Sequence, residues 1–112
     1  MAGQGLGDLE QLVLMAVIRL SRDAYAVSVR NEIEAQTGRA VSRGAVYVTL
    51  DRLARKGYLV SHMGEPTAQR GGKAKRLFTI AAPGVVALQA SLAGIQQMVR
   101  GIERHVAWKP TT

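Results

Sequence analysis

The chain has 112 residues, a formal net charge of +7 at pH 7 and no cysteine. At this length it forms one domain, and without cysteine it has no disulfides, zinc–cysteine sites or thiol catalysis. Hydrophobic residues make up 47% of the sequence but aromatic residues only 4%. The core must therefore be mostly aliphatic, which suits helices better than a β-sandwich.

The whole excess of positive charge falls between Arg39 and Arg76. This window holds nine basic and two acidic residues, whereas the rest of the chain has six of each. A local concentration of positive charge is what a polyanion-binding surface needs. It favours a nucleic-acid partner over the alternative, a basic face that only keeps the protein in solution.

No stretch of the sequence predicts a membrane span or a secretion signal. The longest apolar run, residues 12–18, is too short to cross a bilayer, and no basic region precedes an apolar one at the N-terminus. The cytoplasm is therefore the expected location.

The N-terminal third of the chain predicts a short arm and two helices. Residues 1–7 are small and Gly-rich, and Asp8 is the expected N-cap of the first helix, with Gln11 in the reciprocal position. The core face of this helix comprises Leu9, Leu12, Val13, Ala16, Val17 and Leu20. It is apolar nearly all round, so part of its cover is expected from a second subunit. A second helix is predicted over residues 25–37, with Gly38 as its left-handed stop.

Residues 42–59 predict the helix around which the rest of the chain is organised. Ser42 lies where an N-cap belongs, and Gly57 lies where a helix should stop. The face expected to be buried consists of Val46, Leu50, Leu53 and Ala54. The opposite face carries Arg43, Gly44, Tyr47, Val48, Asp51 and Arg55. A helix with small residues at its start and hydrogen-bond donors on its outer face is suited to entering a DNA groove.

Two β-strands are predicted next, over residues 58–63 and 75–80, joined by a basic, Gly-rich loop. The loop and the second strand carry Arg70, Gly72, Lys73, Lys75 and Arg76. A loop this long in a small domain is either functional or disordered. As a wing it could reach the phosphate backbone or the minor groove, and the alternative is a solvated basic loop.

A last helix is predicted from Pro83 to about residue 108, followed by a tail over residues 109–112. Its apolar positions are spaced alternately three and four residues apart, the heptad pattern of helices that pack along their length. These positions are Val85, Leu88, Leu92, Ile95, Val99, Ile102 and Val106. We favour a homodimer seam over packing on the protein's own core, because a core-facing helix usually shows a broader apolar stripe.

The sequence gives no support for catalysis. His62 and His105 have no obvious partners, and no Ser–His–acid set, paired carboxylates or metal-ligand spacing stands out. Gly72-Lys73 lacks the spaced glycine and the following Ser or Thr of a phosphate loop. We therefore expect neither an enzyme nor a cofactor or metal site.

Short motifs follow one another in a characteristic order through most of the chain. They are Leu-Gly-Asp-Leu-Glu at 6–10, Ser-Arg-Gly-Ala-Val-Tyr at 42–47, Leu50, Arg52-Leu53, Lys-Gly-Tyr-Leu at 56–59, Arg-Gly-Gly-Lys at 70–73, Lys75-Arg76 and Phe-Thr-Ile at 78–80. This ordered set resembles the PadR family of bacterial transcriptional regulators. The resemblance implies a mainly α fold with a small β-hairpin: a winged helix-turn-helix over residues 8–82 and a C-terminal dimerisation helix over residues 83–108.

The resemblance also implies a function. Members of this family are homodimers that bind operator DNA and mostly repress transcription, so we expect an inverted-repeat operator. Short members dimerise through the C-terminal and N-terminal helices. Some members hold a flat apolar effector against a Trp on the last helix, and the candidate here is Trp108, at the very end of that helix.

Individual roles follow from the pattern and the resemblance. The residues expected to contact DNA are Ser42, Arg43, Gly44, Tyr47, Val48, Arg70, Gly72, Lys73, Lys75 and Arg76. The residues expected at the dimer seam are Leu88, Leu92, Ile95, Val99, Ile102 and Val106. By the resemblance Tyr47 would donate to a phosphate, whereas a Tyr at a domain boundary is the alternative. Arg43 could reach either guanine or a phosphate, and Ser42 could serve only as a helix cap.

Some alternatives stay open at this point. Arg52 and Lys56 could contact DNA, or each could pair with an acid such as Glu32 or Glu34. A winged-helix module that recruits an acidic protein, or a sensor that captures a small molecule at the dimer seam, would share much of the same sequence pattern.

Overall fold

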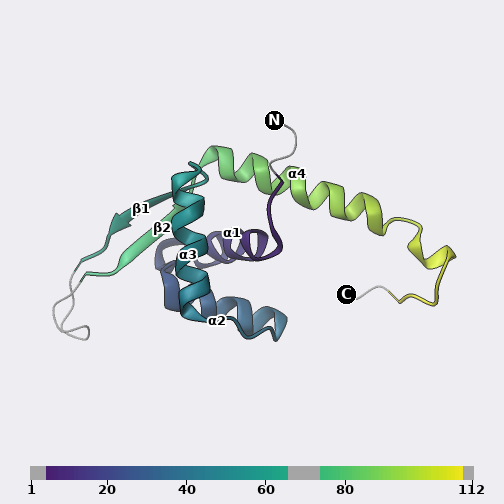
Figure 1. Cartoon of the computed structure of the whole chain (residues 1–112), viewed down its shortest axis with the longest axis horizontal. Coiled ribbons are helices and arrows are strands. Elements are labelled where there is room, and N and C mark those ends of the chain that lie inside the picture. Colours follow the sequence, from purple (N-terminus) through teal and green to yellow (C-terminus); the bar gives the residue numbers. More distant parts are fainter. Residues whose placement is uncertain (1–4, 66–73, 110–112) are drawn as a thin grey trace.

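The computed structural model describes residues 5–65 and 74–109. Three helices come first: α1 (Asp8–Leu20), α2 (Ala26–Thr37) and α3 (Arg43–Arg55), with a short 3-10 turn, η1 (Ser21–Asp23), between α1 and α2. They pack on one another, and an antiparallel hairpin of β1 (Leu59–Met63) and β2 (Arg76–Ile80) extends from their side (Figure 1). The helix α4 (Ala82–Val99) and a 3-10 turn, η3 (Ile102–Arg104), follow. This order confirms the predicted winged helix-turn-helix with a C-terminal helix.

The core is almost wholly aliphatic, as the composition predicts. The fully buried large side chains are Val13, Leu14, Val17, Val29, Val46, Leu50, Leu53 and Phe78. Phe78, the only Phe in the chain, lies on β2 and joins the hairpin to this core. The hairpin register pairs Leu59 with Ile80 and Ser61 with Phe78. Side chains from α1, α3 and the hairpin therefore form one core, and α3 has a fixed buried side.

Local signals in the sequence set where most helices begin and end. The Ser42 Oγ accepts a hydrogen bond from the Ala45 amide at 3.0 Å, which confirms Ser42 as the N-cap of α3. Gly38 after α2 and Gly57 after α3 have φ angles of 73° and 82°, a left-handed region that favours glycine.

The predicted cap of α1 was wrong by one position. Gly7 is the N-cap, and its amide donates to the Glu10 Oε1 at 2.8 Å. Asp8 is instead the first residue of the helix, where its negative charge suits the positive end of the helix dipole. Gln11 is not the reciprocal residue, because Glu10 occupies the third helical position.

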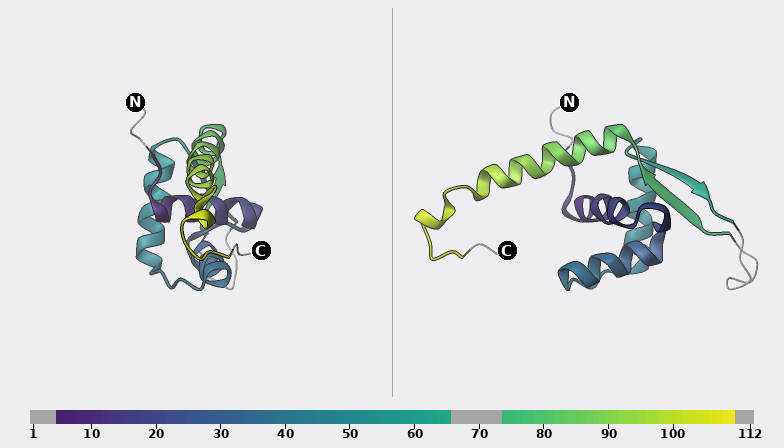
Figure 2. Two further views of the ribbon diagram at one scale, coloured as in Figure 1. Left: turned by 90° about the vertical axis from the view of Figure 1, so that its right-hand side faces the viewer. Right: turned by 180° about the vertical axis from the view of Figure 1, so that it is seen from behind.

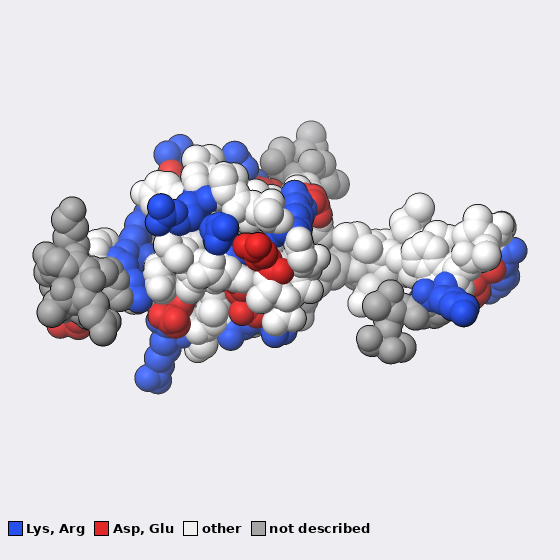
Figure 3. Space-filling view, turned by 90° about the horizontal axis from the view of Figure 1, so that it is seen from below, with Lys and Arg blue, Asp and Glu red and all other residues white. Residues whose placement is uncertain are grey.

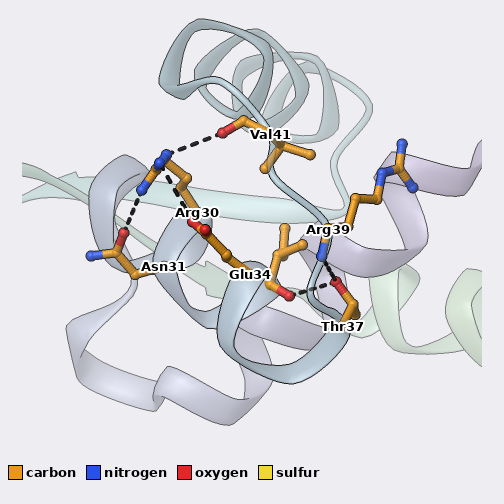
Figure 4. A network of polar contacts seen from close by, with 7 residues as sticks. Arg30, Asn31, Glu34, Thr37, Arg39 and Val41 are labelled. Atoms are coloured by element: carbon orange, nitrogen blue, oxygen red, sulfur yellow. Dashed lines mark hydrogen bonds and ion pairs between the residues drawn. The ribbon is translucent and has the colours of Figure 1, made fainter.

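The turn between α2 and α3 is held by side chains of α2 (Figure 4). The Arg30 Nε donates to the Val41 carbonyl at 3.1 Å, and the guanidinium also lies 3.5 Å from the Glu34 carboxylate. The Thr37 Oγ1 accepts from the Arg39 amide at 3.0 Å. The two hydrogen bonds satisfy the Val41 carbonyl and the Arg39 amide, backbone groups that the turn would otherwise leave without a partner.

The last helix is shorter than predicted. The sequence predicts helix to about residue 108, but α4 ends at Val99, and Gly101 then adopts a left-handed φ of 75°. The chain turns away there into η3, as both views in Figure 2 show. Ile102 and Val106 therefore do not lie on α4, and the heptad pattern on the helix runs only from Val85 to Val99. The apolar spacing continues past Gly101, so it predicted helix beyond the residue where the helix ends.

α4 begins in close contact with Tyr58, in the short segment between α3 and β1. A Cβ added to Gly84 would lie 2.3 Å from the Tyr58 carbonyl oxygen, a distance that no side chain can occupy without a backbone shift. The Tyr58 carbonyl also accepts from the Ala81 amide at 3.0 Å. Gly84 thus allows α4 to start directly against the base of the hairpin.

A buried carboxylate and two partly exposed cations tie the start of α1 to the end of α3. The Glu10 side chain is almost fully buried, and its Oε2 lies 2.9 Å from the Lys56 Nζ and 3.9 Å from an Arg52 nitrogen. Burial works to raise the pKa of Glu10, but the Gly7 amide, Lys56 and Arg52 outweigh it, so the pKa is lowered. The carboxylate is therefore ionised at neutral pH and hydrogen-bonded through both oxygens, which is the state in which it stabilises the fold.

We expect Gly84→Ala to destabilise the protein by about 2 kcal/mol, because the new methyl group overlaps the Tyr58 carbonyl. Gly94→Ala is the matched control, since a Cβ at Gly94 meets nothing within 4 Å. There the usual helix preference for Ala should leave stability unchanged or raise it by up to about 1 kcal/mol. Urea unfolding measures both, and equal effects would contradict the close contact.

Glu10→Gln should lower the free energy of unfolding at pH 7 by about 2 kcal/mol, because Gln has no negative charge for Lys56 and only one acceptor oxygen for the two donors, the Gly7 amide and Lys56. The pKa of Glu10 is lower in the folded than in the unfolded chain, so its contribution is present above about pH 4.5 and is lost as the pH falls through the folded-state pKa. The difference between variant and parent should therefore shrink in acid. Glu34→Gln, which removes an exposed pair with Arg30, should have little effect at any pH.

Candidate nucleic-acid interface

The outer face of α3 is open to solvent. Because Val46, Leu50 and Leu53 are buried, the residues between them on the helix point outward. Tyr47 is 46% exposed and Val48 is 55% exposed. Arg43 and Gly44 are exposed beside them, directly after the Ser42 cap. The structure thus brings five of the sequence-predicted site residues together at one end of one helix.

One edge of this face meets the start of β2, at the end of the hairpin next to its loop. The Arg76 Nη1 donates to the Tyr47 hydroxyl oxygen at 3.0 Å and to the Asp51 Oδ1 at 3.2 Å, and Arg76 Nη2 donates to the Ser61 Oγ at 3.3 Å. Asp51 also lies 2.6 Å from Arg55, four residues further along α3. The predicted wing residue Arg76 is thus bound to α3 within the protein.

Lys75 is also turned toward the protein. Its Nζ lies 3.6 Å from the Asp23 carboxylate and 3.8 Å from the centre of the Tyr25 ring, a cation–π contact. Lys75 and Arg76 therefore fasten the second strand of the hairpin to η1 and α3. The other predicted wing residues, Arg70, Gly72 and Lys73, lie outside the described residues.

Arg52 and Lys56 were expected either to contact DNA or to pair with an acid such as Glu32 or Glu34. The structure shows an acidic partner for both, but it is a different residue from the two expected. Both face Glu10, whereas Glu32 pairs with Arg19 at 2.7 Å and Glu34 pairs with Arg30. Glu10 is far away in sequence, so no local spacing could indicate it. Arg52 keeps about half of its side chain exposed on the outer side of α3.

The predicted seam residues differ in their surroundings. Leu88 is buried and Leu92 partly buried against the domain's own core, whereas Ile95 and Val99 are 48% and 43% exposed further along α4. The first part of α4 therefore packs on its own chain, and the second part projects from it (Figure 1). Trp108 is exposed and lies beyond η3, so it is not on the helix that the sequence predicts for it.

Charge is unevenly distributed over the surface. Lys and Arg side chains gather on the folded body and beside the hairpin, whereas the projecting part of the chain is largely uncharged until near its C-terminal end (Figure 3). α4 contains no charged residue at all from Ala82 to Val99. On this face the molecule thus separates a charged region from a largely uncharged one.

Two other kinds of site are not found in the part of the chain that the structure describes. None of the helices over residues 5–65 and 74–109 is both long and apolar enough to cross a membrane. The same residues contain no group of three or more His, Asp or Glu side chains placed to hold a metal ion.

The fold resembles solved structures of transcriptional regulators and one part of a DNA-bound ORC1 protein. A regulator from Clostridium thermocellum is 19% identical, with a TM-score of 0.71 over 88% of this chain and 89% of that chain. A PadR-like regulator from Bacillus cereus is 14% identical, with a TM-score of 0.71 over 90% and 93% of the two chains. The ORC1 protein of Aeropyrum pernix, solved in complex with DNA, is 18% identical, with a TM-score of 0.64 over 84% of this chain and 26% of that chain.

At these identities the structural likeness shows the fold alone, and no curated protein sequence matches this chain. The sequence itself is more informative, because residues 13–90 match the family described as the transcriptional regulator PadR-like family. That match begins within α1 and runs through α2, α3 and the hairpin into the first half of α4, which is well over half of the chain. The chain therefore belongs to the PadR-like family of transcriptional regulators.

Proposed function

We propose that this protein is a repressor that binds an inverted-repeat operator as a homodimer, with the N-terminal end of α3 in the major groove. The observation that carries the proposal is the outer face of α3, where Arg43, Gly44, Tyr47 and Val48 are exposed beside a capped helix start. A recognition helix needs small residues and hydrogen-bond donors at this end. A repressor acts where the chromosome is, so the proposed location is the cytoplasm of a bacterial cell.

The parts of this face suit different contacts. Arg43 can bond guanine or a phosphate, Tyr47 can donate to a phosphate, and Val48 can meet a thymine methyl group. Gly44 leaves room for the helix to approach the duplex, and Ser42 holds the helix start in place. The loop with Arg70, Gly72 and Lys73 would contact the phosphate backbone beside the major-groove site. Only the positive charge of this loop supports that contact.

The proposed dimer rests on the projecting half of α4. Ile95, Met98 and Val99 are exposed there on a helix without any charged residue, which a monomer in water would rarely maintain. A second copy packed along the heptad positions would cover them. A two-fold dimer would present two α3 helices to DNA, which is the reason for expecting an inverted repeat with half-sites about one helical turn apart.

Removing Arg43 should weaken binding to duplex DNA and reduce its dependence on salt. If Arg43 contacts a phosphate, the slope of log affinity against log salt falls by about 0.9 for each phosphate that is no longer neutralised. If it reads guanine, affinity falls while preference among sequences relaxes. Arg43→Ala is compared with Arg104→Ala, which removes the same charge on η3, at the far end of the projecting segment from α3 (Figure 1). Equal reductions in affinity for the two variants, measured by fluorescence anisotropy, would remove Arg43 from the interface.

Ile95→Asp and Val99→Asp should each convert a dimer to monomers, because a buried unpaired carboxylate in the seam is strongly unfavourable. Both side chains are exposed in the single chain, so its fold should survive. Gln97→Asp, on the same helix but outside the heptad seam, is the matched control and should remain dimeric. Sedimentation equilibrium reports the mass, and variants that remain dimeric would refute the seam.

A further inference from the structure

We propose that Arg76 is a positioning residue: it orients the Tyr47 hydroxyl for a DNA phosphate and does not itself bind DNA. This inference rests on the proposed function, because it assigns a role within the same interface. It also reverses the simplest interpretation of the sequence, in which Arg76 is one of several wing cations that contact phosphates.

Arg76 is held by several side chains of the protein. Its two terminal nitrogens donate to Tyr47, Asp51 and Ser61, and the guanidinium carbon lies 4.9 Å from the centre of the Phe78 ring. Only 29% of the side chain is exposed. A guanidinium held by three acceptors and an aromatic ring is not free to follow a phosphate. Burial works to lower the pKa of Arg76, but Tyr47 and Asp51 outweigh it, so the pKa is raised and the group stays charged.

The contact with Arg76 determines what the Tyr47 hydroxyl can still do. A phenol has one hydrogen to donate, and an oxygen that can also accept. Because Arg76 donates to this oxygen at 3.0 Å, the hydrogen of Tyr47 is not used in the contact. Nearly half of Tyr47 is exposed on the outer face of α3, so this hydrogen is available to a phosphate oxygen. The tyrosine is thus held in one orientation before DNA arrives, which reduces the entropy cost of binding.

Asp51 completes the arrangement. A carboxylate on the DNA-facing side of α3 would repel phosphates, but this one is paired with Arg76 at 3.2 Å and with Arg55 at 2.6 Å. The pair with Arg55 offsets this charge even without Arg76, and the pair with Arg76 keeps that guanidinium next to Tyr47. Since Arg76 lies on β2 and its three partners lie on α3 and β1, the same contacts join the hairpin to the recognition helix.

A double-mutant cycle in DNA binding tests the proposal. The probe is a fluorescein-labelled, mixed-sequence duplex of about 30 base pairs, roughly three helical turns, titrated by anisotropy between about 50 and 200 mM NaCl. The variants are Tyr47→Phe, Arg76→Gln and both together, with Arg104→Gln as the control for removal of a charge. A mixed sequence is sufficient because a phosphate contact does not depend on the bases.

If Arg76 acts through Tyr47, Tyr47→Phe and Arg76→Gln should each reduce the affinity for DNA about tenfold per protomer in contact with the duplex. The double variant should bind no more weakly than Tyr47→Phe alone. The salt slope should stay that of the parent, since a neutral hydroxyl releases no counterion. Arg76→Lys should also bind more weakly, because a lysine cannot bridge Tyr47, Asp51 and Ser61 together.

A direct contact between Arg76 and a phosphate would give a different set of results. The reductions in affinity would be additive, Arg76→Gln would lower the salt slope by about 0.9 for each phosphate, and Arg76→Lys would bind normally. These results together would overturn the proposal. The Tyr47 ring resonances of the free protein, identified by their absence in Tyr47→Phe, should also shift in Arg76→Gln. Unchanged resonances in the folded variant would overturn the positioning role without reference to DNA. A parent chain that does not bind the duplex would instead overturn the proposed function, while shifted resonances would still show the contact itself.

Discussion

The burial of one side of α3 is the constraint on which the rest of the structure depends. Val46, Leu50 and Leu53 have no exposed surface, because α1, α2 and the hairpin close around them. Burying each such side chain is worth about 1.5–3 kcal/mol, so rotating the helix to hide its outer face would cost several times that amount. Arg43, Tyr47 and Val48 are exposed as a direct consequence, and the basic character of this region adds to a surface that packing has already fixed.

Local signals in the sequence predicted much of this fold. The cap at Ser42 and the stops at Gly38 and Gly57 act within a few residues, and each lies where the chain alone indicates it. The end of α4 was missed for a related reason, because the apolar spacing continues past a glycine whose left-handed backbone interrupts the helix. Periodicity reports which side of a helix is apolar but does not report where the helix stops.

The pairing of charges could not be predicted, because it joins residues that are distant in the sequence. The ion pair between Glu10 and Lys56 and the hydrogen bond between Arg76 and Tyr47 form only after the chain has folded. Sequence alone treats the basic residues between Arg39 and Arg76 as one group. The structure divides them into cations that hold the protein together, such as Lys56 and Arg76, and exposed cations such as Arg43 on the outer face of α3. Net charge therefore overstates the number of side chains that can reach a phosphate.

Backbone NMR of the protein titrated with duplex DNA tests the central claim most directly, because it locates the contact without assuming any residue's role. The account predicts that the largest amide shifts cluster at residues 42–48, at the start of α3, and around Arg76 at the start of β2. The exposed half of α4, which is expected to face a second subunit, should change little. Shifts centred on α4 or on the far side of α2, with α3 unaffected, would contradict the assignment of α3 as the recognition helix.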